Sequence, residues 1–313
     1  MRKKIVIGTR SSKLALWQAD YVADCLRKEY PGLQVEKKLM TTKGDKILDA
    51  PLAKIGGKGL FTKELEEEML SGGIDIAVHS LKDMPTEVPE GLIIAAITKR
   101  ADPGDAVVSL KYGHFEDLPK GAKVGTSSLR RKAQLLHARP DLTIRDLRGN
   151  VNTRLRKLEE ENFDAIVLAV AGLTRLGFAD RITEVLPREM MLPAVGQGAL
   201  AIEARGNDAE LLQMISFLND EDMVCCAGGE RAFLSKVEGG CQVPVGVFGS
   251  VEGECLKLEA VIASLDGSRL YRDILIGPKD EAKRLGEELA ERLLAAGGLE
   301  IMQELGLLLD KVR

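Results

Sequence analysis

The sequence is poor in aromatic residues and has no long hydrophobic run. Only 4% of its 313 residues are Phe, Trp or Tyr, so few rings are present for stacking nucleic-acid bases. The formal net charge of -4 also argues against a general nucleic-acid-binding protein. No apolar run approaches the roughly 18 residues that a membrane-spanning helix needs. We therefore expect neither nucleic acid nor a membrane as a partner.

Histidine and cysteine are too few and too scattered to indicate a metal site. The three histidines are His79, His114 and His137, and none is spaced for metal binding with a cysteine or another histidine. Five cysteines, an odd number at irregular spacing, favour free thiols in a reducing compartment over a disulfide framework. The start of the chain, MRKKIVIG, lacks the apolar core of a signal peptide, so we expect a cytoplasmic protein.

The order of apolar and amphipathic stretches predicts an α/β protein. Short apolar runs alternate with amphipathic stretches over the first two thirds of the chain, as in parallel sheets covered by helices. The turn-rich segment Arg100–Asp105 interrupts this alternation. The expected strands are 5–9, 35–41, 74–79, 92–98, 106–110, 123–126, 142–147 and 165–170, with helices at 14–30, 61–70, 129–138 and 151–161.

Two further changes of pattern predict three domains. The apolar run at 199–204 is expected to return to the first sheet, which gives two α/β domains with a hinged cleft between them. From about residue 220 the pattern becomes a helix, three strand-like runs at 245–251, 256–265 and 270–276, and a helical tail, typical of a small α+β domain. The expected domains are residues 1–99 with 199–218, residues 104–194, and residues 219–313.

Arginines and small hydroxyl residues gather at the ends of the strand-like runs. Guanidinium groups stay charged at any working pH and bind carboxylates through two parallel hydrogen bonds, and capped helix starts present backbone N–H groups to anions. The pattern predicts a cleft for a carboxylate-rich ligand, although a solvated helix surface is the ordinary location of any single arginine. The residues are Arg10, Ser12, Thr126, Ser127, Ser128, Arg130, Arg131, Arg148, Arg154 and Arg175.

Two further motifs carry candidate reactive groups. HSLKDMP places Ser80, Lys82 and Asp83 directly after an apolar strand, where site residues lie in such folds; an ordinary polar loop is the alternative. EGGCQVP places Cys241 in a constrained loop, as a nucleophile, an attachment point or an inert thiol. Cys225 and Cys226 are expected to be packing residues, with metal or oxidant sensitivity left open.

Two glycine-rich segments have different interpretations. KIGGKGLF, with Lys54, Lys58 and Phe61, indicates a mobile lid and not a phosphate-binding loop, because no Ser or Thr follows the lysine. GQGALA, which contains Gln197, imitates a dinucleotide-binding motif but precedes a strand-like run instead of a helix. We therefore reject a dinucleotide site there.

Seven motifs together resemble the porphobilinogen deaminase, or hydroxymethylbilane synthase, family. They occur in order along most of the chain: TRSSKLAL, GGKGLFTKEL, DIAVHSLKDMP, VGTSSLRR, LRGNVNTRL, LPAVGQGA and EGGCQVPVG. The resemblance implies two domains similar to periplasmic binding proteins, a smaller third domain, and a monomeric transferase of tetrapyrrole and haem biosynthesis. It also implies a dipyrromethane cofactor attached by a thioether to Cys241.

The resemblance further implies a reaction and roles for the residues. Four porphobilinogen molecules would be joined head to tail to the anchored cofactor with loss of ammonia, and the linear tetrapyrrole would then be released by hydrolysis. Asp83 would be the catalytic residue, Lys82 and the arginines would bind carboxylates, and Phe61 would cover a ring. The ligand would also receive hydrogen bonds from a set of hydroxyl and amide residues. These are Ser12, Ser80, Thr126, Ser127, Ser128 and Gln197.

Two rival functions remain open from the residues alone. A hinged anion-binding protein without chemistry would share the cleft and the arginines, but would need neither Asp83 nor a thioether at Cys241. A nucleic-acid-binding module is disfavoured by the overall acidity.

Overall fold

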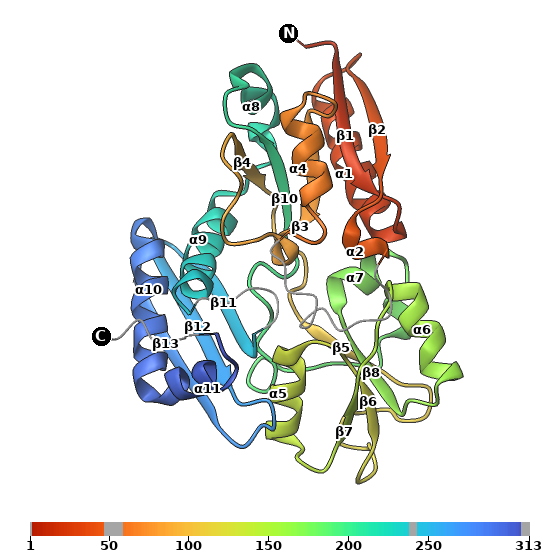
Figure 1. Cartoon of the computed structure of the whole chain (residues 1–313), viewed down its shortest axis with the longest axis vertical. Helices are drawn as coiled ribbons and strands as arrows, with labels where there is room; N and C mark the ends of the chain where they lie inside the picture. Colours follow the sequence, from red (N-terminus) through yellow and green to blue (C-terminus); the bar gives the residue numbers. More distant parts are fainter. Residues whose placement is uncertain (1, 47–58, 238–242, 308–313) are drawn as a thin grey trace. The chain divides into compact units, whose positions relative to one another are not determined.

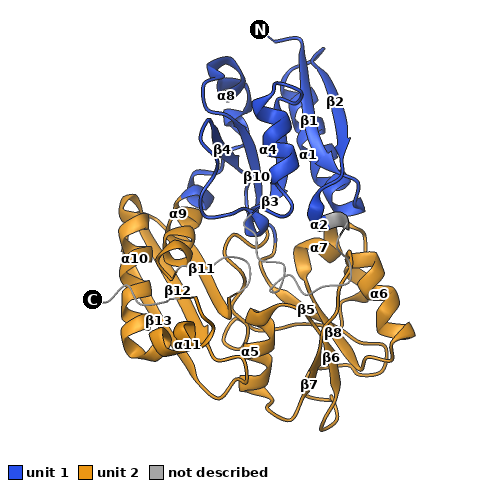
Figure 2. Cartoon of the chain, in the orientation of Figure 1, with its two compact units in different colours: residues 1–101, 199–224 blue, residues 102–198, 225–313 orange. Residues whose placement is uncertain are grey.

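The computed structural model describes residues 2–46, 59–237 and 243–307. The chain forms two compact units, coloured separately in Figure 2. Unit 1 comprises residues 1–101 and 199–224, and unit 2 comprises residues 102–198 and 225–313. The segment expected to form a third domain is thus grouped with the second α/β segment, and the three-domain division stays a prediction.

Unit 1 is built on a five-stranded sheet in the order β2-β1-β3-β10-β4 (Figure 1). Strands β1, β2 and β3 are parallel, whereas β10 is antiparallel to both of its neighbours. The expected return of the apolar run at 199–204 to the first sheet is therefore confirmed. The strands are β1 (Lys4–Arg10), β2 (Gln34–Met40), β3 (Ile76–Ser80), β4 (Leu92–Ile97) and β10 (Leu200–Arg205).

Helices cover both faces of this sheet because successive strand residues point to opposite sides. Ile5, Ile7 and Ile76 pack with α1 and α8, whereas Ala77 and Leu92 pack with α4 on the other face. The helical segments are α1 (Lys13–Glu29), α2 (Lys43–Lys46), α4 (Lys63–Leu70), η1 (Leu81–Asp83), α8 (Ala209–Ile215) and η3 (Ser216–Leu218).

Helix α1 shows how the local sequence sets these elements. Ser12 caps its amino end by accepting a hydrogen bond from the backbone N–H of Ala15. Arg27 and Lys28 lie in its last turn, where positive charge complements the helix dipole. Its buried residues recur every three or four positions, which gives one apolar face for the sheet. They are Ala15, Gln18, Ala19, Val22, Ala23 and Leu26.

The first part of unit 2 repeats this design with the strand order β7-β6-β8-β5-β9. Strands β6, β7 and β8 are parallel, and β5 runs antiparallel to β8 and β9. Leu135 of α5 packs on one face of the sheet, and Leu155 of α6 and Leu173 of α7 pack on the other. The elements are β5 (Asp105–Val108), β6 (Lys123–Gly125), α5 (Leu129–Ala138), β7 (Thr143–Arg145), α6 (Val151–Glu160), β8 (Ala165–Ala169), α7 (Val170–Arg175), η2 (Ala179–Arg181) and β9 (Glu184–Val185).

The last part of unit 2 is a three-stranded antiparallel sheet with helices, as the change of pattern near residue 220 predicts. Helices α9 and α10 approach closely at two glycines: a Cβ on Gly286 would lie 2.1 Å from the carbonyl oxygen of Gly229. The elements are α9 (Glu221–Lys236), β11 (Val245–Glu252), β12 (Cys255–Ala263), β13 (Leu270–Pro278), η4 (Lys279–Glu281), α10 (Ala282–Leu293), η5 (Leu294–Gly298) and α11 (Leu299–Glu304).

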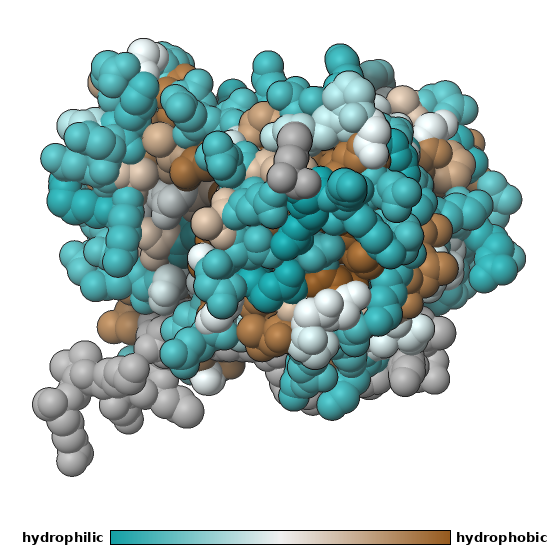
Figure 3. Space-filling view, turned by 90° about the horizontal axis from the view of Figure 1, so that it is seen from above, coloured by the Kyte–Doolittle hydropathy of each residue, from teal (hydrophilic) through white to brown (hydrophobic). Residues whose placement is uncertain are grey.

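On the face drawn in Figure 3, polar residues predominate, and the apolar residues of the described part form separate areas among them. Within the described part of the chain, no helix combines the length and the apolar character needed to cross a bilayer.

We predict that the hairpin between β12 and β13 tolerates no side chain at its glycine. Gly267 has a φ of +74°, and a Cβ there would lie 2.3 Å from the backbone nitrogen of His137. Gly253 has a similar φ of +61° with nothing within 4 Å, so it is a matched control. Gly267→Ala should lower the free energy of unfolding by roughly 1–3 kcal/mol more than Gly253→Ala, measured by urea denaturation. Equal losses would contradict the close approach.

Candidate active site

In unit 1, candidate residues gather at one edge of the sheet. Because β1 and β3 are parallel, the residues that follow them lie at the same edge. Arg10 ends β1, and its guanidinium lies 4.3 Å from the centre of the Phe61 ring, within the range of a cation–π contact. Ser80 ends β3, and η1 follows with half-buried Lys82 and exposed Asp83.

The loop that carries Asp83 is held to its surroundings by hydrogen bonds. Gln18 Nε2 donates to Ser80 Oγ over 2.7 Å, and the N–H of Leu81 donates to the carbonyl of Ala199 over 3.0 Å. The N–H of Met84 donates to the carbonyl of Leu81, which closes the short turn. The carboxylate of Asp83 is thus presented to solvent on a fixed piece of backbone.

In unit 2, a second group of candidates lies where the parallel strands β6 and β7 end. Ser127 Oγ donates to the carbonyl of Leu147 and accepts from the N–H of the same residue, so it joins the loops after the two strands. Ser128 caps α5, and Asn150 caps α6. The amino ends of two ten-residue helices, which carry partial positive charge, therefore lie at this edge.

Four more candidates of unit 2 contact backbone carbonyls or lie in the loops after the strands. Arg154 Nε donates to the carbonyl of Gly149, whose φ of +114° requires glycine. Arg148 is half-buried in the loop before α6, and Thr126 is buried after β6. Arg175, at the end of α7, donates to the carbonyl of Gly198 over 2.6 Å.

The arginines Arg130 and Arg131 lie inside the protein and share one carboxylate. Asp105, fully buried at the start of β5, accepts from Arg130 Nη1 at 2.6 Å and from Arg131 Nε and Nη2 at 2.9 and 2.6 Å. Gln197 Nε2 completes the set at 3.0 Å. Each arginine is only 5% exposed. Sequence analysis expected both guanidiniums to face the ligand; the structure gives both a partner within unit 2.

The electrostatics of this cluster favour an anion nearby. Burial opposes ionisation of Asp105, but the two guanidiniums outweigh it and hold the pKa of that carboxyl well below its usual range. Burial also lowers the pKa of Arg130, against the opposing effect of Asp105. Two guanidiniums against one carboxylate leave one net positive charge, and an unbalanced buried charge is costly.

Some of the predicted site residues fall outside the described residues. These are Cys241 and the lid residues Lys54 and Lys58. The four cysteines that the structure describes are free thiols, with Cys226 buried and Cys225 partly so. In residues 2–46, 59–237 and 243–307, no group of three His, Cys, Asp or Glu side chains is arranged to hold a metal ion.

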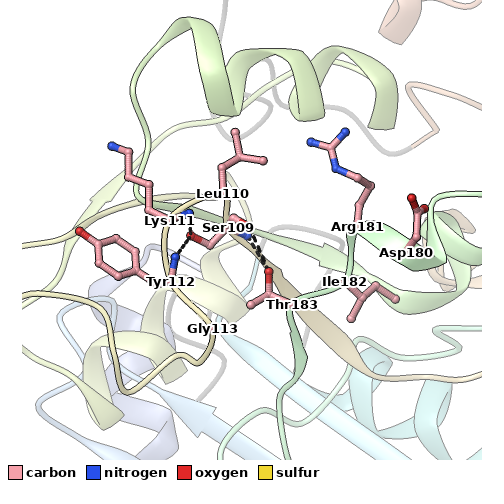
Figure 4. Close-up of a pocket in the computed structure, with 9 residues that line it drawn as sticks. All are labelled: Ser109, Leu110, Lys111, Tyr112, Gly113, Asp180, Arg181, Ile182 and Thr183. Carbon is pink, nitrogen blue, oxygen red and sulfur yellow. Dashed lines mark hydrogen bonds between the residues drawn. The ribbon is translucent and has the colours of Figure 1, made fainter.

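A hollow of about 540 Å³ on unit 2 contains none of the predicted site residues. It is lined by residues 109–113 and 180–183, including Lys111 and Arg181 (Figure 4). It lies where β5 ends, and because β5 is antiparallel to β8, this is the sheet edge opposite to the capped helix starts. Lys111 Nζ already donates to Asn162, and Arg181 pairs with Glu159.

Comparison with known proteins finds two family models that match successive parts of the chain. Residues 5–213 match the family described as "Porphobilinogen deaminase, dipyromethane cofactor binding domain", and residues 224–295 match "Porphobilinogen deaminase, C-terminal domain". The chain belongs to the porphobilinogen deaminase family. A porphobilinogen deaminase of Geobacter metallireducens is 55% identical over 96% of this chain and 95% of its own length; that of Pelobacter propionicus is 54% identical over 96% and 97%.

Solved structures similar to this porphobilinogen deaminase family member include methionine-binding proteins. The methionine-binding protein MetQ has a TM-score of 0.45 and 15% identity, over 69% of this chain and 89% of that one. A putative methionine-binding lipoprotein of Bacillus subtilis has a TM-score of 0.42 and 12% identity, over 69% and 90%.

Sequence analysis missed Asp105, which it assigned only to a turn, and two residues of unit 1. The available signal for Asp105 was its place directly before an apolar strand, at the edge where arginines were expected. Gln18 is the polar exception on the buried face of α1, and Glu203 is a carboxylate inside the otherwise apolar core of β10. A polar residue in a buried pattern needs a partner, which is the signal that could have identified both.

We predict that Asp105→Asn destabilises the protein strongly. The change leaves two buried guanidiniums without their carboxylate, so the free energy of unfolding at pH 7 should fall by about 3–5 kcal/mol in urea denaturation. The native pKa lies below the unfolded value of about 3.9, so the stabilisation by the carboxylate is complete above that pH. The difference between wild type and variant should therefore narrow as the pH falls below about 4.

The partly exposed pair Arg139–Asp141 provides the control for this prediction. Its side chains are about one quarter exposed, and the carboxylate is bound at 2.8 Å. Asp141→Asn should change stability far less than Asp105→Asn, because solvent screens an exposed pair. Similar unfolding midpoints for the two variants would contradict the importance of the buried cluster.

Proposed function

We propose that this protein is a hydroxymethylbilane synthase. It joins four molecules of porphobilinogen head to tail onto a covalently bound dipyrromethane, with loss of one ammonia at each addition, and releases the linear tetrapyrrole by hydrolysis. The observation that carries the proposal is membership of the porphobilinogen deaminase family over nearly the whole chain. Its cytoplasmic location and monomeric state, expected from the sequence, stay predictions.

The described residues fit a carboxylate-rich cofactor. The cluster of Arg130, Arg131 and Asp105 carries one net positive charge, and capped helix starts lie at the ends of the neighbouring strands. Porphobilinogen and dipyrromethane bear acetate and propionate side chains, so a site for them needs cationic and N–H donors. When bound, the dipyrromethane supplies the pyrrole ring to which the first substrate unit is joined. Cys241 is proposed to hold it by a thioether.

The arginines and Lys82 are proposed to bind the carboxylates of the growing chain. Each added unit brings two more carboxylates, and each charge-assisted hydrogen bond contributes about 1.5–3 kcal/mol before desolvation. Arg148, half-buried at the cationic edge of unit 2, is the clearest candidate there. Arg10, Arg154 and Arg175 complete the proposed set, with hydrogen bonds to the ligand from Ser12, Ser80, Thr126, Ser127, Ser128 and Gln197.

Asp83 is proposed to act on the substrate directly. When the C–N bond of the aminomethyl group breaks, the electron pair leaves with ammonia and the pyrrole retains a positive charge. A carboxylate beside it stabilises that cation, which surrounding arginines would disfavour. It also accepts the proton that the attacking pyrrole loses from its α-carbon when the new C–C bond forms. The exposed position of Asp83 on a fixed turn suits both roles.

The lid is proposed to cover the substrate from the side of unit 1. Phe61, which contacts Arg10, is the member of the lid that the structure describes. A ring in that position can stack on a pyrrole while the guanidinium binds its carboxylate.

The attachment of the cofactor can be tested by mass. We predict that the protein, purified from cells that supply porphobilinogen, weighs more than its sequence by one dipyrromethane, measured by intact-protein mass spectrometry. Cys241→Ser should return the mass to that of the unmodified chain, because an alcohol does not form the thioether. Cys255→Ser, at an exposed thiol of the same part of the chain, is the control and should retain the added mass. An unmodified wild-type protein would refute the assignment.

The role of Asp83 can be tested by turnover. Asp83→Asn keeps the size of the side chain and removes its charge, so we expect release of linear tetrapyrrole to fall by at least about a hundredfold. The melting temperature should change little because the side chain is exposed. Glu87→Gln, exposed a few residues further along, is the control. Turnover by Asp83→Asn within a few-fold of wild type would contradict the proposed role.

A further inference from the structure

A buried cluster of ionisable side chains lies inside unit 1, and the proposed chemistry does not use it. His79 of β3 and Glu203 of β10 are in contact, with 3.1 Å between His79 Nε2 and Glu203 Oε2. Their side chains are 6% and 0% exposed. Glu66 of α4 is buried against the same face of the sheet. Removing an ionisable side chain from water is costly, so such side chains are rarely buried unless hydrogen bonds or opposite charges offset the cost.

The carboxylate oxygens of this cluster differ in their hydrogen bonds. Burial raises the pKa of Glu66, and the negative charge of Glu203 adds to the rise. Oε1 of Glu66 and Oε1 of Glu203 are both buried without a hydrogen-bond partner in the described part of the chain. The other carboxylate oxygen of Glu203, Oε2, contacts Nε2 of His79 and accepts a hydrogen bond in the tautomer that carries the proton on that nitrogen.

The cluster adjoins the turn that carries Asp83, because His79 lies two residues before the start of η1. His79 is the last buried residue of β3, followed by Ser80 and then by η1. The turn is held from two further directions, by Gln18 of α1 through Ser80 and by the carbonyl of Ala199 through Leu81. β10 pairs with the end of β3 through its backbone, and the contact between Glu203 and His79 adds a buried side-chain link between the same two strands.

We propose that Glu203 is a positioning residue for the reaction: by hydrogen-bonding His79 it fixes the end of β3 and so the direction of the Asp83 carboxylate. This rests on the catalytic role proposed for Asp83. Glu203 does not touch the substrate, and its effect passes through the backbone of residues 79–83. A displacement of about 1 Å in a catalytic group can reduce the rate about a hundredfold, so the tether is expected to affect kcat.

Two substitutions at this position separate hydrogen bonding from size. Glu203→Leu keeps the approximate volume but removes the hydrogen bond to His79, so kcat should fall at least about tenfold. KM should stay within about threefold, because most of the residues proposed to bind carboxylates lie outside residues 79–83. Glu203→Gln keeps an oxygen that accepts from His79, so kcat should stay within about threefold of wild type.

Arg205 provides the matched control on the same strand. Its guanidinium donates to the carbonyls of Met69 and Ile74, each over 2.7 Å, at the opposite end of β3. Arg205→Met should lower the melting temperature while leaving kcat unchanged. A loss of kcat in Arg205→Met as large as that in Glu203→Leu would overturn the proposal, because instability alone would then explain both. Wild-type kcat in Glu203→Leu would overturn it as well.

A third variant keeps the test decisive if Glu203→Leu does not fold. Gln18→Leu removes the hydrogen bond to Ser80 and thus a second tether of the same turn. A selective fall in its kcat, together with near-normal kcat in Glu203→Gln, supports positioning of Asp83 by buried partners; unchanged kcat in Gln18→Leu opposes it. Wild-type protein that does not convert porphobilinogen would instead contradict the proposed function, which separates the two failures.

Discussion

The buried carboxylate of Asp105 is the interaction on which unit 2 depends most. It neutralises one of two guanidiniums that lie almost wholly out of solvent, and it also binds Gln197, just before the chain crosses into unit 1. Without it, the start of α5 would carry two adjacent like charges in a medium that screens them poorly. The arginines beside the edge proposed to bind carboxylates are therefore held in place by the protein itself. A ligand that uses their residual charge meets a site that is already ordered.

The two α/β segments use the same topology for different chemical tasks. In unit 1 the parallel strands end in a carboxylate, a lysine and an arginine, which suits the handling of a positive charge that develops during reaction. In unit 2 the corresponding strand ends lead into capped helices and arginines, which suits the holding of permanent negative charge. A condensation of acid-bearing pyrroles needs both functions, because its substrate is anionic at the side chains and becomes cationic at the reacting carbon.

The sequence predicts the order of elements well because alternation and periodicity are local properties. Most expected strands and helices are present, and the helix expected at 129–138 has the bounds of α5. Differences arise where tertiary contacts decide: the strand expected at 165–170 ends at Ala169, because Val170 begins α7, and the strand expected at 142–147 is reduced to β7. The short helix α8 was not expected, since seven residues give a weak periodic signal.

The site residues show more clearly that contacts between distant parts of the sequence cannot be predicted from local patterns. Motifs identified Asp83 and the arginines, and the structure places several of them at the strand ends where they were expected. The burial of Arg130 and Arg131 was not predictable, because it depends on a carboxylate about 25 positions earlier in the chain. Pairing of His79 with Glu203, 124 positions apart, has no local signal at all. Long-range partners of buried charges appear only in the folded structure.

The hydroxyl of Ser127 both gives a hydrogen bond to Leu147 and receives one from it, and so it joins the loops after β6 and β7. Two loops tied at such a point share their thermal motion instead of fluctuating separately. A ligand that orders one loop then also restricts the other loop and the start of the helix that follows it. The conformational entropy of the two loops is therefore lost in one binding event instead of two. A second ligand that contacts either loop would then lose less conformational entropy on binding than the first.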